Sequence, residues 1–225
     1  MVVGNILMAD NIQRKQVIFA LCGIIAPILF WVMVIVESLI RPGYSPVHNF
    51  VSDLGVGSLA ILQNINFMIF GILTIGLGLG LHGSIPTPRG VSLKSGVLLV
   101  IIFGILIFFA GLFPENYGSG VLHTSVSAFA FLSIIAAQLL TWKGLKGMDT
   151  AIWGEYRIYS LFSGLLSIIF LILLQVAISD FAAYQGLAQR LFLAIPWIWV
   201  GVTGLVLYSF IRNKYKLPKK GKNRN

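Results

Sequence analysis

Six stretches of this chain contain no charged residue, and they constrain its fold more than any other feature. Each stretch is at least 20 residues long. A helix of 20 residues rises about 30 Å, which is the thickness of the hydrocarbon core of a bilayer. A charge at the bilayer centre costs about 2.5–3.5 kcal/mol, which explains why the charges lie between the stretches. The charge-free stretches are residues 16–36, 54–88, 95–114, 116–142, 158–179 and 191–211.

The stretches predict an all-α, polytopic membrane bundle of six transmembrane helices. Backbone groups in lipid must form their hydrogen bonds within the spanning segment, which favours helices over strands. The composition agrees, because 57% of residues are hydrophobic and 10% charged, against about 45–50% and about 25% in a soluble domain. An ordinary soluble enzyme is therefore excluded. The predicted helices lie near residues 17–38, 61–82, 96–113, 121–142, 158–179 and 191–211.

We expect three parts along the chain. They are an N-terminal segment at residues 1–16, the six-helix domain at 17–211 and a basic tail at 212–225. The first apolar run exceeds the roughly 7–15 residues of a signal peptide, and no small-residue cleavage site follows it, so we predict a retained helix. Either Met1 or Met8 is compatible with this reading as the start.

The positions of Lys and Arg predict the orientation. With the N-terminus in the cytoplasm, 14 of the 16 basic residues fall in cytoplasmic segments, and only Arg41 and Arg190 lie outside. Cytoplasmic loops of membrane proteins carry such an excess of positive charge. We therefore predict a multi-pass protein of the cell membrane with both termini in the cytoplasm.

The basic tail and the single cysteine limit the partners. Each Lys or Arg near an anionic membrane surface contributes about 1 kcal/mol, so we expect the tail at residues 212–225 to contact anionic lipids of the bilayer. Nucleic-acid binding is the alternative, but no folded module surrounds the tail, and we predict no such partner. Cys22 alone excludes a disulfide framework within the chain. We expect no cofactor, and the oligomeric state stays open.

The segment after the first predicted helix reads ESLIRPGYSPVHNFVSDLG. Pro42 and Gly43 break the helix, and Ser45 followed by Pro46 is typical of a new helix start. Gly55 is a suitable C-cap, so we predict a short interfacial or re-entrant helix between Ser45 and Gly55. Its apolar face would carry Val47, Phe50, Val51 and Leu54, and its polar face His48, Asn49, Ser52 and Asp53.

Two further polar segments are expected on the same outer side. One contains Glu115 and His123, and the other contains Asp180 and Arg190. Polar groups at membrane depth usually face a cavity or a bundle interior, which predicts an outer-facing polar pocket. The predicted ligand-binding residues are Arg41, Tyr44, Ser45, His48, Asn49, Ser52, Asn64, Glu115, Asp180 and Arg190.

Within this pocket the sequence suggests roles for several residues. Arg41 and Arg190 are candidates for binding an anionic headgroup. Asp53 and His123 would be base and acid if the protein catalyses a reaction, which stays open.

Two other site chemistries would involve the histidines. A three-histidine metal site is excluded because His82 is predicted about 30 Å from the other two histidines, at the opposite end of its helix. We predict no metal, and a site formed by His48, His123 and Asp53 remains the alternative. His48 and Ser52 lie four residues apart, as a base and a nucleophile could, but the chain has no G-x-S-x-G motif.

Three motifs resemble a prokaryotic membrane family called domain of unknown function 998. They are RPGYSPVHNFVSDLG, NINFMIFGIL and GLFPENYGSGVLH. The resemblance covers roughly residues 17–211 and implies a six-helix membrane protein with a site at these motifs. The matching residues are Ser52, Asp53, Leu54, Gly55, Asn64, Gly71, Gly111, Phe113, Pro114 and His123.

The leading hypothesis is a membrane protein whose outer pocket binds, and in one version modifies, a lipid or another amphiphile. A transporter of a small molecule or ion is the first alternative, because three helices precede residue 115 and three follow it, as in transporters built from inverted repeats. A non-catalytic partner or sensor subunit is the second.

Overall fold

The computed structural model describes residues 2–85, 90–148 and 151–214. Its described residues form six long helices, and all six are long and apolar enough to cross a membrane, as predicted. Met1 and residues 215–225 of the predicted tail lie outside the described residues. The elements are α1 (Val2–Ile40), η1 (Ser52–Gly55), α2 (Ala60–Ser84), α3 (Val91–Leu112), α4 (Val121–Gly144), α5 (Ala151–Asp180), η2 (Ala182–Tyr184) and α6 (Gln185–Lys214).

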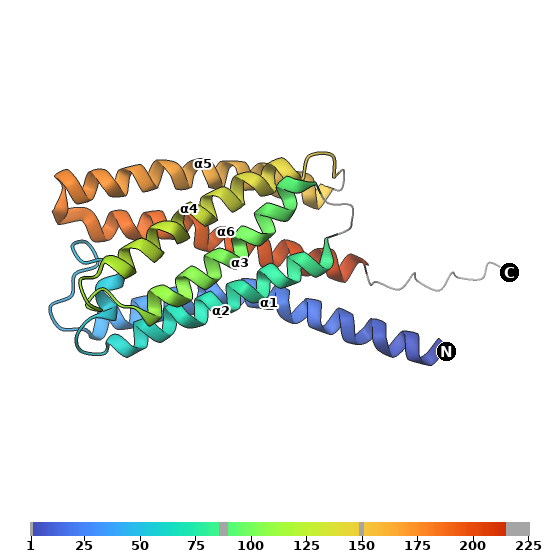
Figure 1. The fold of residues 1–225 in the computed structure, drawn as a ribbon, viewed down its shortest axis with the longest axis horizontal. Helices are drawn as coiled ribbons and strands as arrows, with labels where there is room; N and C mark the ends of the chain where they lie inside the picture. Colours follow the sequence, from blue (N-terminus) through green and yellow to red (C-terminus); the bar gives the residue numbers. More distant parts are fainter. Residues whose placement is uncertain (1, 86–89, 149–150, 215–225) are drawn as a thin grey trace.

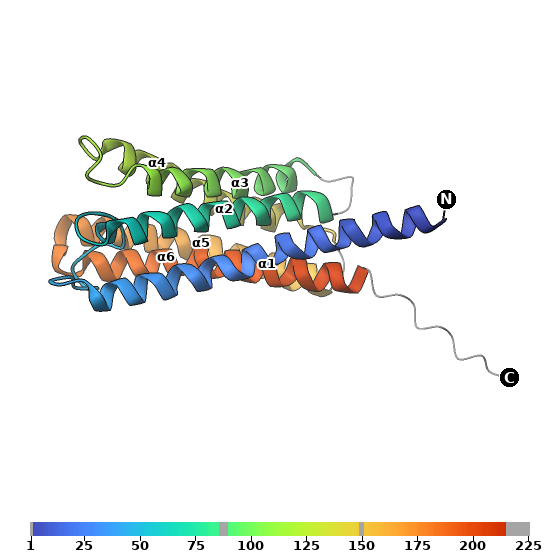
Figure 2. The same cartoon turned by 90° about the horizontal axis from the view of Figure 1, so that it is seen from below.

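The six helices form a closed ring. Each helix packs against its neighbours in the sequence, and α6 returns to contact α1. The connections at residues 41–59, 113–120 and 181–184 meet at one end of the bundle, which we call the loop end (Figures 1 and 2). The start of α1 and the end of α6 lie at the opposite end, which we call the far end.

An aromatic cluster from four helices forms the centre of the core. Trp197 of α6 stacks on Phe70 of α2, with ring centroids 4.6 Å apart. Phe30 of α1 and Phe103 of α3 approach the same indole at 5.4 and 5.5 Å. Such aromatic pairs contribute about 0.5–1.5 kcal/mol each beyond their burial, so Trp197 is a fixed point of the bundle.

Close packing of α2 and α3 depends on two facing glycines. A Cβ added to Gly104 would lie 2.7 Å from the carbonyl oxygen of Gly71. No side chain fits at that distance, and small residues let membrane helices approach closely enough for van der Waals packing to hold them.

The helices α4 and α5 are in contact at the far end and separate toward the loop end (Figure 1). In the closed part, Gln138 donates a hydrogen bond to Ser163 at 3.0 Å. A Cβ on Gly164 would lie 2.7 Å from the side chain of Leu139. The separation toward the loop end leaves space between these two helices.

The connection at residues 41–59, which we call the α1–α2 loop, differs in detail from the prediction. It contains a short helix, but this is the 3₁₀ turn η1 at Ser52–Gly55 rather than a helix from Ser45 onward. Asn49 accepts the N–H of Ser45 at 2.9 Å, and Asp53 accepts the N–H of Phe50 at 2.8 Å. These side chains compete with a continuous helical ladder, so the loop folds as two separate turns.

Candidate functional site

Arg190, near the start of α6, ties the α1–α2 loop to the bundle. Its guanidinium group donates to the carbonyl oxygens of Pro46 at 2.8 Å, Asn49 at 2.7 Å and Gly186 at 3.0 Å. It also donates to the hydroxyl of Tyr44, over whose ring it lies. Burial raises the pKa of Tyr44, while Arg190 opposes that shift.

Arg41 and Asp53 fix the second half of the same loop. Arg41 donates to the carbonyl oxygens of Asp53, at 2.8 Å, and of Val56. The carbonyl of Asp53 also accepts the N–H of Val56 at the end of the 3₁₀ turn, at 3.1 Å. Both arginines predicted to hold an anionic headgroup therefore bind loop carbonyls in this structure.

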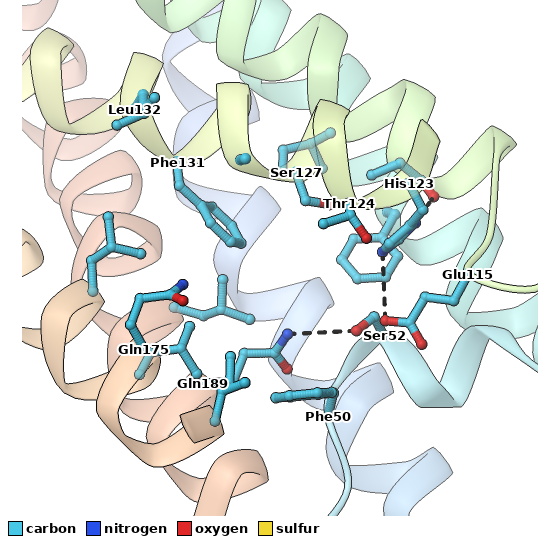
Figure 3. A pocket seen from close by; sticks show the side chains of 18 of the residues that line it. Phe50, Ser52, Glu115, His123, Thr124, Ser127, Phe131, Leu132, Gln175 and Gln189 are labelled. Carbon is cyan, nitrogen blue, oxygen red and sulfur yellow. Dashed lines mark hydrogen bonds and ion pairs between the residues drawn. The ribbon is translucent and has the colours of Figure 1, made fainter. Parts of the chain in front are cut away.

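Gln189 holds the end of the loop that faces the bundle. Its Oε1 accepts the N–H of Val51 at 2.6 Å, and its Nε2 lies 3.5 Å from the hydroxyl of Ser52. The second contact is at the upper limit for a hydrogen bond, so the amide N–H group retains the capacity to bind another acceptor. Ser52 is thereby held between α6 and the beginning of α4 (Figure 3).

The imidazole of His123 has a defined orientation. Its Nδ1 lies 3.0 Å from the carbonyl oxygen of Ala110 and 2.9 Å from that of Phe113. A carbonyl oxygen only accepts, so Nδ1 carries the hydrogen. Nε2 is therefore the ring nitrogen that faces Glu115, and it lies 3.8 Å from Oε1 of that carboxyl.

Glu115 is an acid in an unfavourable place for charge. Burial raises the pKa of its carboxyl above the usual 4.5, the Asp53 carboxylate raises it further, and Ser52 and His123 partly oppose the shift. A carboxyl with a raised pKa and an imidazole at one site can serve as general acid and base toward a bound molecule. The predicted pair was Asp53 with His123, whereas the structure places Glu115 next to His123 and Asp53 beside Glu115.

A cavity of about 370 Å³ opens beside this pair (Figure 3). Its volume lies in the range of about 300–1,000 Å³ found for small-molecule sites. Five of its lining residues are also exposed on α4 and α5, namely Thr124, Ala128, Leu132, Gln175 and Ile178. Their exposure places the opening of the cavity between these two helices. The cavity is therefore open sideways, where lipid would surround a membrane protein.

The cavity changes from polar to apolar away from the loop end. Gln189, Leu193 and Trp197 recur every four residues on α6 and so descend about 12 Å along it. His123 and Phe131 are separated by the same eight residues on α4. Figure 3 shows Ser52, Glu115 and His123 on one side of the cavity, with Phe131, Leu132 and Gln175 on the other.

Trp197 connects the cavity to the core. It lines the apolar part of the cavity and is fully buried. Within the described chain, its indole N–H has no hydrogen-bond partner. Buried donors without a partner are rare in proteins.

The predicted ligand-binding residues divide into three groups. Ser52 and Glu115 line the cavity, as does His123 of the predicted acid–base pair, whereas Asp53 does not. His48 and Asp180 are exposed and do not line it. Asn64 supports the α1–α2 loop, because it donates to the carbonyl of Gly55 at 3.2 Å. The remaining predicted residues likewise belong to this loop or hold it in place: Arg41, Tyr44, Ser45, Asn49 and Arg190.

The two alternative chemistries are not assembled. Across the described ranges, no group of three or more His, Cys, Asp or Glu side chains could hold a metal ion. The set of His48, His123 and Asp53 is therefore not brought together. His48 is exposed while Ser52 is buried beside Gln189, so the structure does not pair this histidine with this serine.

The region that contains the cavity also identifies the family. A family model described as "Protein of unknown function (DUF998)" matches residues 24–206. The chain belongs to the DUF998 family. Comparison with curated proteins and with solved structures found no match. Every residue that lines the cavity lies within the part of the chain matched by the DUF998 model.

The motifs that carried the DUF998 resemblance meet in space. Asn64 of α2 binds the carbonyl of Gly55 in η1, and Gly111 of α3 packs against the backbone of Asn64. Residues from separate motifs thus form one structural unit at the loop end.

The sequence interpretation missed Gln189 and a set of buried serines. Helix 6 was predicted to begin at residue 191, but α6 begins at Gln185, so Gln189 projects from a helix. Gln189 and Leu193 are four residues apart, and this helical spacing could have indicated that both project from one face of a helix. We use the name polar seam for four buried residues on one face of α5: Tyr156, Ser160, Ser163 and Ser167. In the sequence, the serines of α5 stand singly among apolar residues, and we did not recognise from them a polar face on this helix.

Proposed function

We propose that this membrane protein binds a lipid or another amphiphile in the cavity between α4 and α5. The head of the amphiphile would lie at Ser52, Glu115 and His123, and its chain would extend toward Phe131 and Trp197. The observation that carries the proposal is the change from polar to apolar lining along a cavity that is open sideways. A lipid in a bilayer has the same order of groups along its length.

The orientation supports an outer-leaflet site. Fourteen of 16 Lys and Arg residues would be cytoplasmic with both termini inside, as the positive-inside rule requires. The loop end then faces the outside, and the cavity opens into the outer half of the bilayer of the cell membrane.

Glu115 and His123 give the site the means for proton transfer. The raised pKa of Glu115 and the fixed Nδ1–H of His123 place an acid and a base beside the proposed head position. General acid–base chemistry requires such groups within hydrogen-bond reach of the reacting atom. Binding is the proposed function, and modification of the head would be an extension of it.

Blocking the lateral opening tests the proposal. Ala128 lines the cavity and is exposed on α4, so Ala128→Trp should fill the opening and reduce the lipid that is retained through purification. Ile72→Trp on the exposed face of α2, outside the cavity, is the matched control. Lipid extracted from each purified variant would be quantified by mass spectrometry. Equal lipid content in both variants and the wild type would contradict the proposal.

A transporter is the second candidate, and the polar seam favours it. The hydroxyl groups of Tyr156 and Thr203 lie 2.6 Å apart, and Trp199 donates to Ser160 at 3.1 Å. The seam continues on α5 from the cavity toward the far end, and within the described chain the hydroxyl of Ser167 has no partner. Polar residues inside membrane bundles can mark a pathway, although they also hold helices together.

Cysteine accessibility separates the two functions. On a Cys22→Ser background, cysteines at Ser127, Ser160 and Ser167 would be labelled with a water-soluble maleimide from either side of the membrane. Labelling at Ser127 alone supports a binding cavity. Labelling of Ser160 from the far side, changing with an added solute, would support transport instead.

A further inference from the structure

The polar end of the cavity has a carboxyl group in its lining and, among the described residues, no arginine. Glu115 lines the cavity, and the Asp53 carboxylate is close enough to act on it. The nearest arginines that the structure describes in this region, Arg41 and Arg190, bind carbonyls of the α1–α2 loop and do not line the cavity. A ligand head therefore meets carboxyl, imidazole, hydroxyl and amide groups.

The head of the ligand must determine selectivity. An acyl chain that leaves the bilayer for the cavity exchanges one apolar surrounding for another, so its burial contributes little to the choice between lipids. Polar contacts, in contrast, are strengthened in surroundings of low dielectric constant. Discrimination between amphiphiles should thus arise at Ser52, Glu115, His123 and Gln189.

Resting on the proposed function, we infer that the cavity selects an amphiphile with an uncharged, hydroxyl-bearing head over one with an anionic phosphate head. A hydroxyl group donates and accepts, so it can donate to Nε2 of His123 or to Glu115 and accept from the amide of Gln189. A phosphate would lie against the Glu115 carboxyl, whose ionised form repels it, and neither Arg41 nor Arg190 lines the cavity to balance its charge. A glycerol monoester of a fatty acid represents the favoured class.

Trp197 provides a way to detect the occupant of the cavity. Its buried N–H has no partner within the described chain, and it lies about 12 Å along α6 from Gln189. An acyl chain whose head binds at Gln189 would reach this indole. A heavy atom in that part of the chain should therefore quench Trp197 fluorescence.

Two probes with the same chain test the inference. One is a monoacylglycerol with a brominated acyl chain, and the other carries that chain on glycerol phosphate. Both would be titrated into detergent micelles containing the full-length protein. The signal of Trp197 is the difference between the wild type and Trp197→Phe, which removes the contributions of the other tryptophans.

We expect half-quenching by the glycerol-headed probe at a mole fraction about tenfold lower than by the phosphate-headed probe, the ratio expected from one charge-assisted contact. In Glu115→Gln the ratio should approach one, while Asp180→Asn, which removes an exposed carboxylate outside the cavity, should preserve it. Equal quenching by both probes in the wild type, or a preference for phosphate, would overturn the inference but leave amphiphile binding intact. No quenching of Trp197 by either probe would overturn both.

Discussion

The far half and the loop half of the α4–α5 interface use polar side chains differently. In the far half, Gln138 binds Ser163 across the interface, and Gly164 allows α5 to lie against Leu139. In the loop half the helices separate, and His123 and Glu115 line a cavity instead. The same two helices therefore join the bundle at one end and form a site at the other.

This difference shows how a predominantly apolar chain can reserve space for a ligand. In lipid, polar pairs between helices and close contacts at small residues hold a bundle together. Where a polar group is instead carried by a loop that a helix holds in place, as Ser52 is by Gln189 of α6, it remains available to line a cavity. Loops supported by a rigid scaffold commonly carry binding residues.

The largest effect is expected from adding bulk to the closed half. Gly164→Leu should lower the free energy of unfolding by about 3 kcal/mol, because overpacking forces helices apart. Ala128→Leu adds similar bulk at the opening of the cavity. It should change the free energy of unfolding by less than about 0.5 kcal/mol, as substitutions of exposed residues usually do. Unfolding in mixed micelles would measure both. Equal destabilisation would remove the distinction between the halves.

The loop half should depend on Arg190. Arg190→Ala leaves the carbonyls of Pro46 and Asn49 without this donor and should cost about 2 kcal/mol, the range for hydrogen bonds to a charged group. Limited proteolysis should then cut the α1–α2 loop faster. Arg190→Lys keeps the charge but not the planar group and should recover only part of the loss. Full recovery by lysine would show that charge alone holds the loop.

A pH dependence of smaller size is expected from Glu115. Because its pKa is raised in the folded protein, mainly by burial, the folded state loses stability as pH rises from about 4.5 through the shifted pKa. Glu115→Gln should remove this loss, so the variant should be the more stable form above that window. Its side chain is 32% exposed, and solvent screening limits the effect to below about 1 kcal/mol. The midpoint of thermal unfolding would be measured between pH 4 and 8 for the wild type and for Glu115→Gln. Parallel curves for the two proteins would contradict the prediction.

The smallest effect should come from the polar pair in the closed half. A double-mutant cycle of Gln138→Leu and Ser163→Ala should give a coupling energy of about 0.6 kcal/mol, the average for such pairs in a membrane protein. The same cycle for His123→Phe and Glu115→Gln measures the pair at the cavity. A coupling at Gln138–Ser163 that is several times larger would mean that the seam, and not helix packing, holds the far half together.

The helices were predictable because charges are excluded from the hydrocarbon core, and the positions of charged residues are visible in the sequence. The contacts of the site were less accessible. The sequence pairs Asp53 with His123, because the order of residues along the chain does not reveal that Glu115 lies next to this histidine. The sequence assigns Arg41 and Arg190 to a ligand, whereas both bind carbonyl groups of the α1–α2 loop. Which carbonyls of an irregular loop need a side-chain donor cannot be predicted without the loop's backbone conformation.

A structure of the protein in a lipid bilayer tests the central claim most directly. The account predicts elongated density between α4 and α5, with its wider end within hydrogen-bond distance of Glu115 or His123 and its narrow end against Trp197. Helices α4 and α5 in contact along their full length, or a cavity that holds only water, would contradict it.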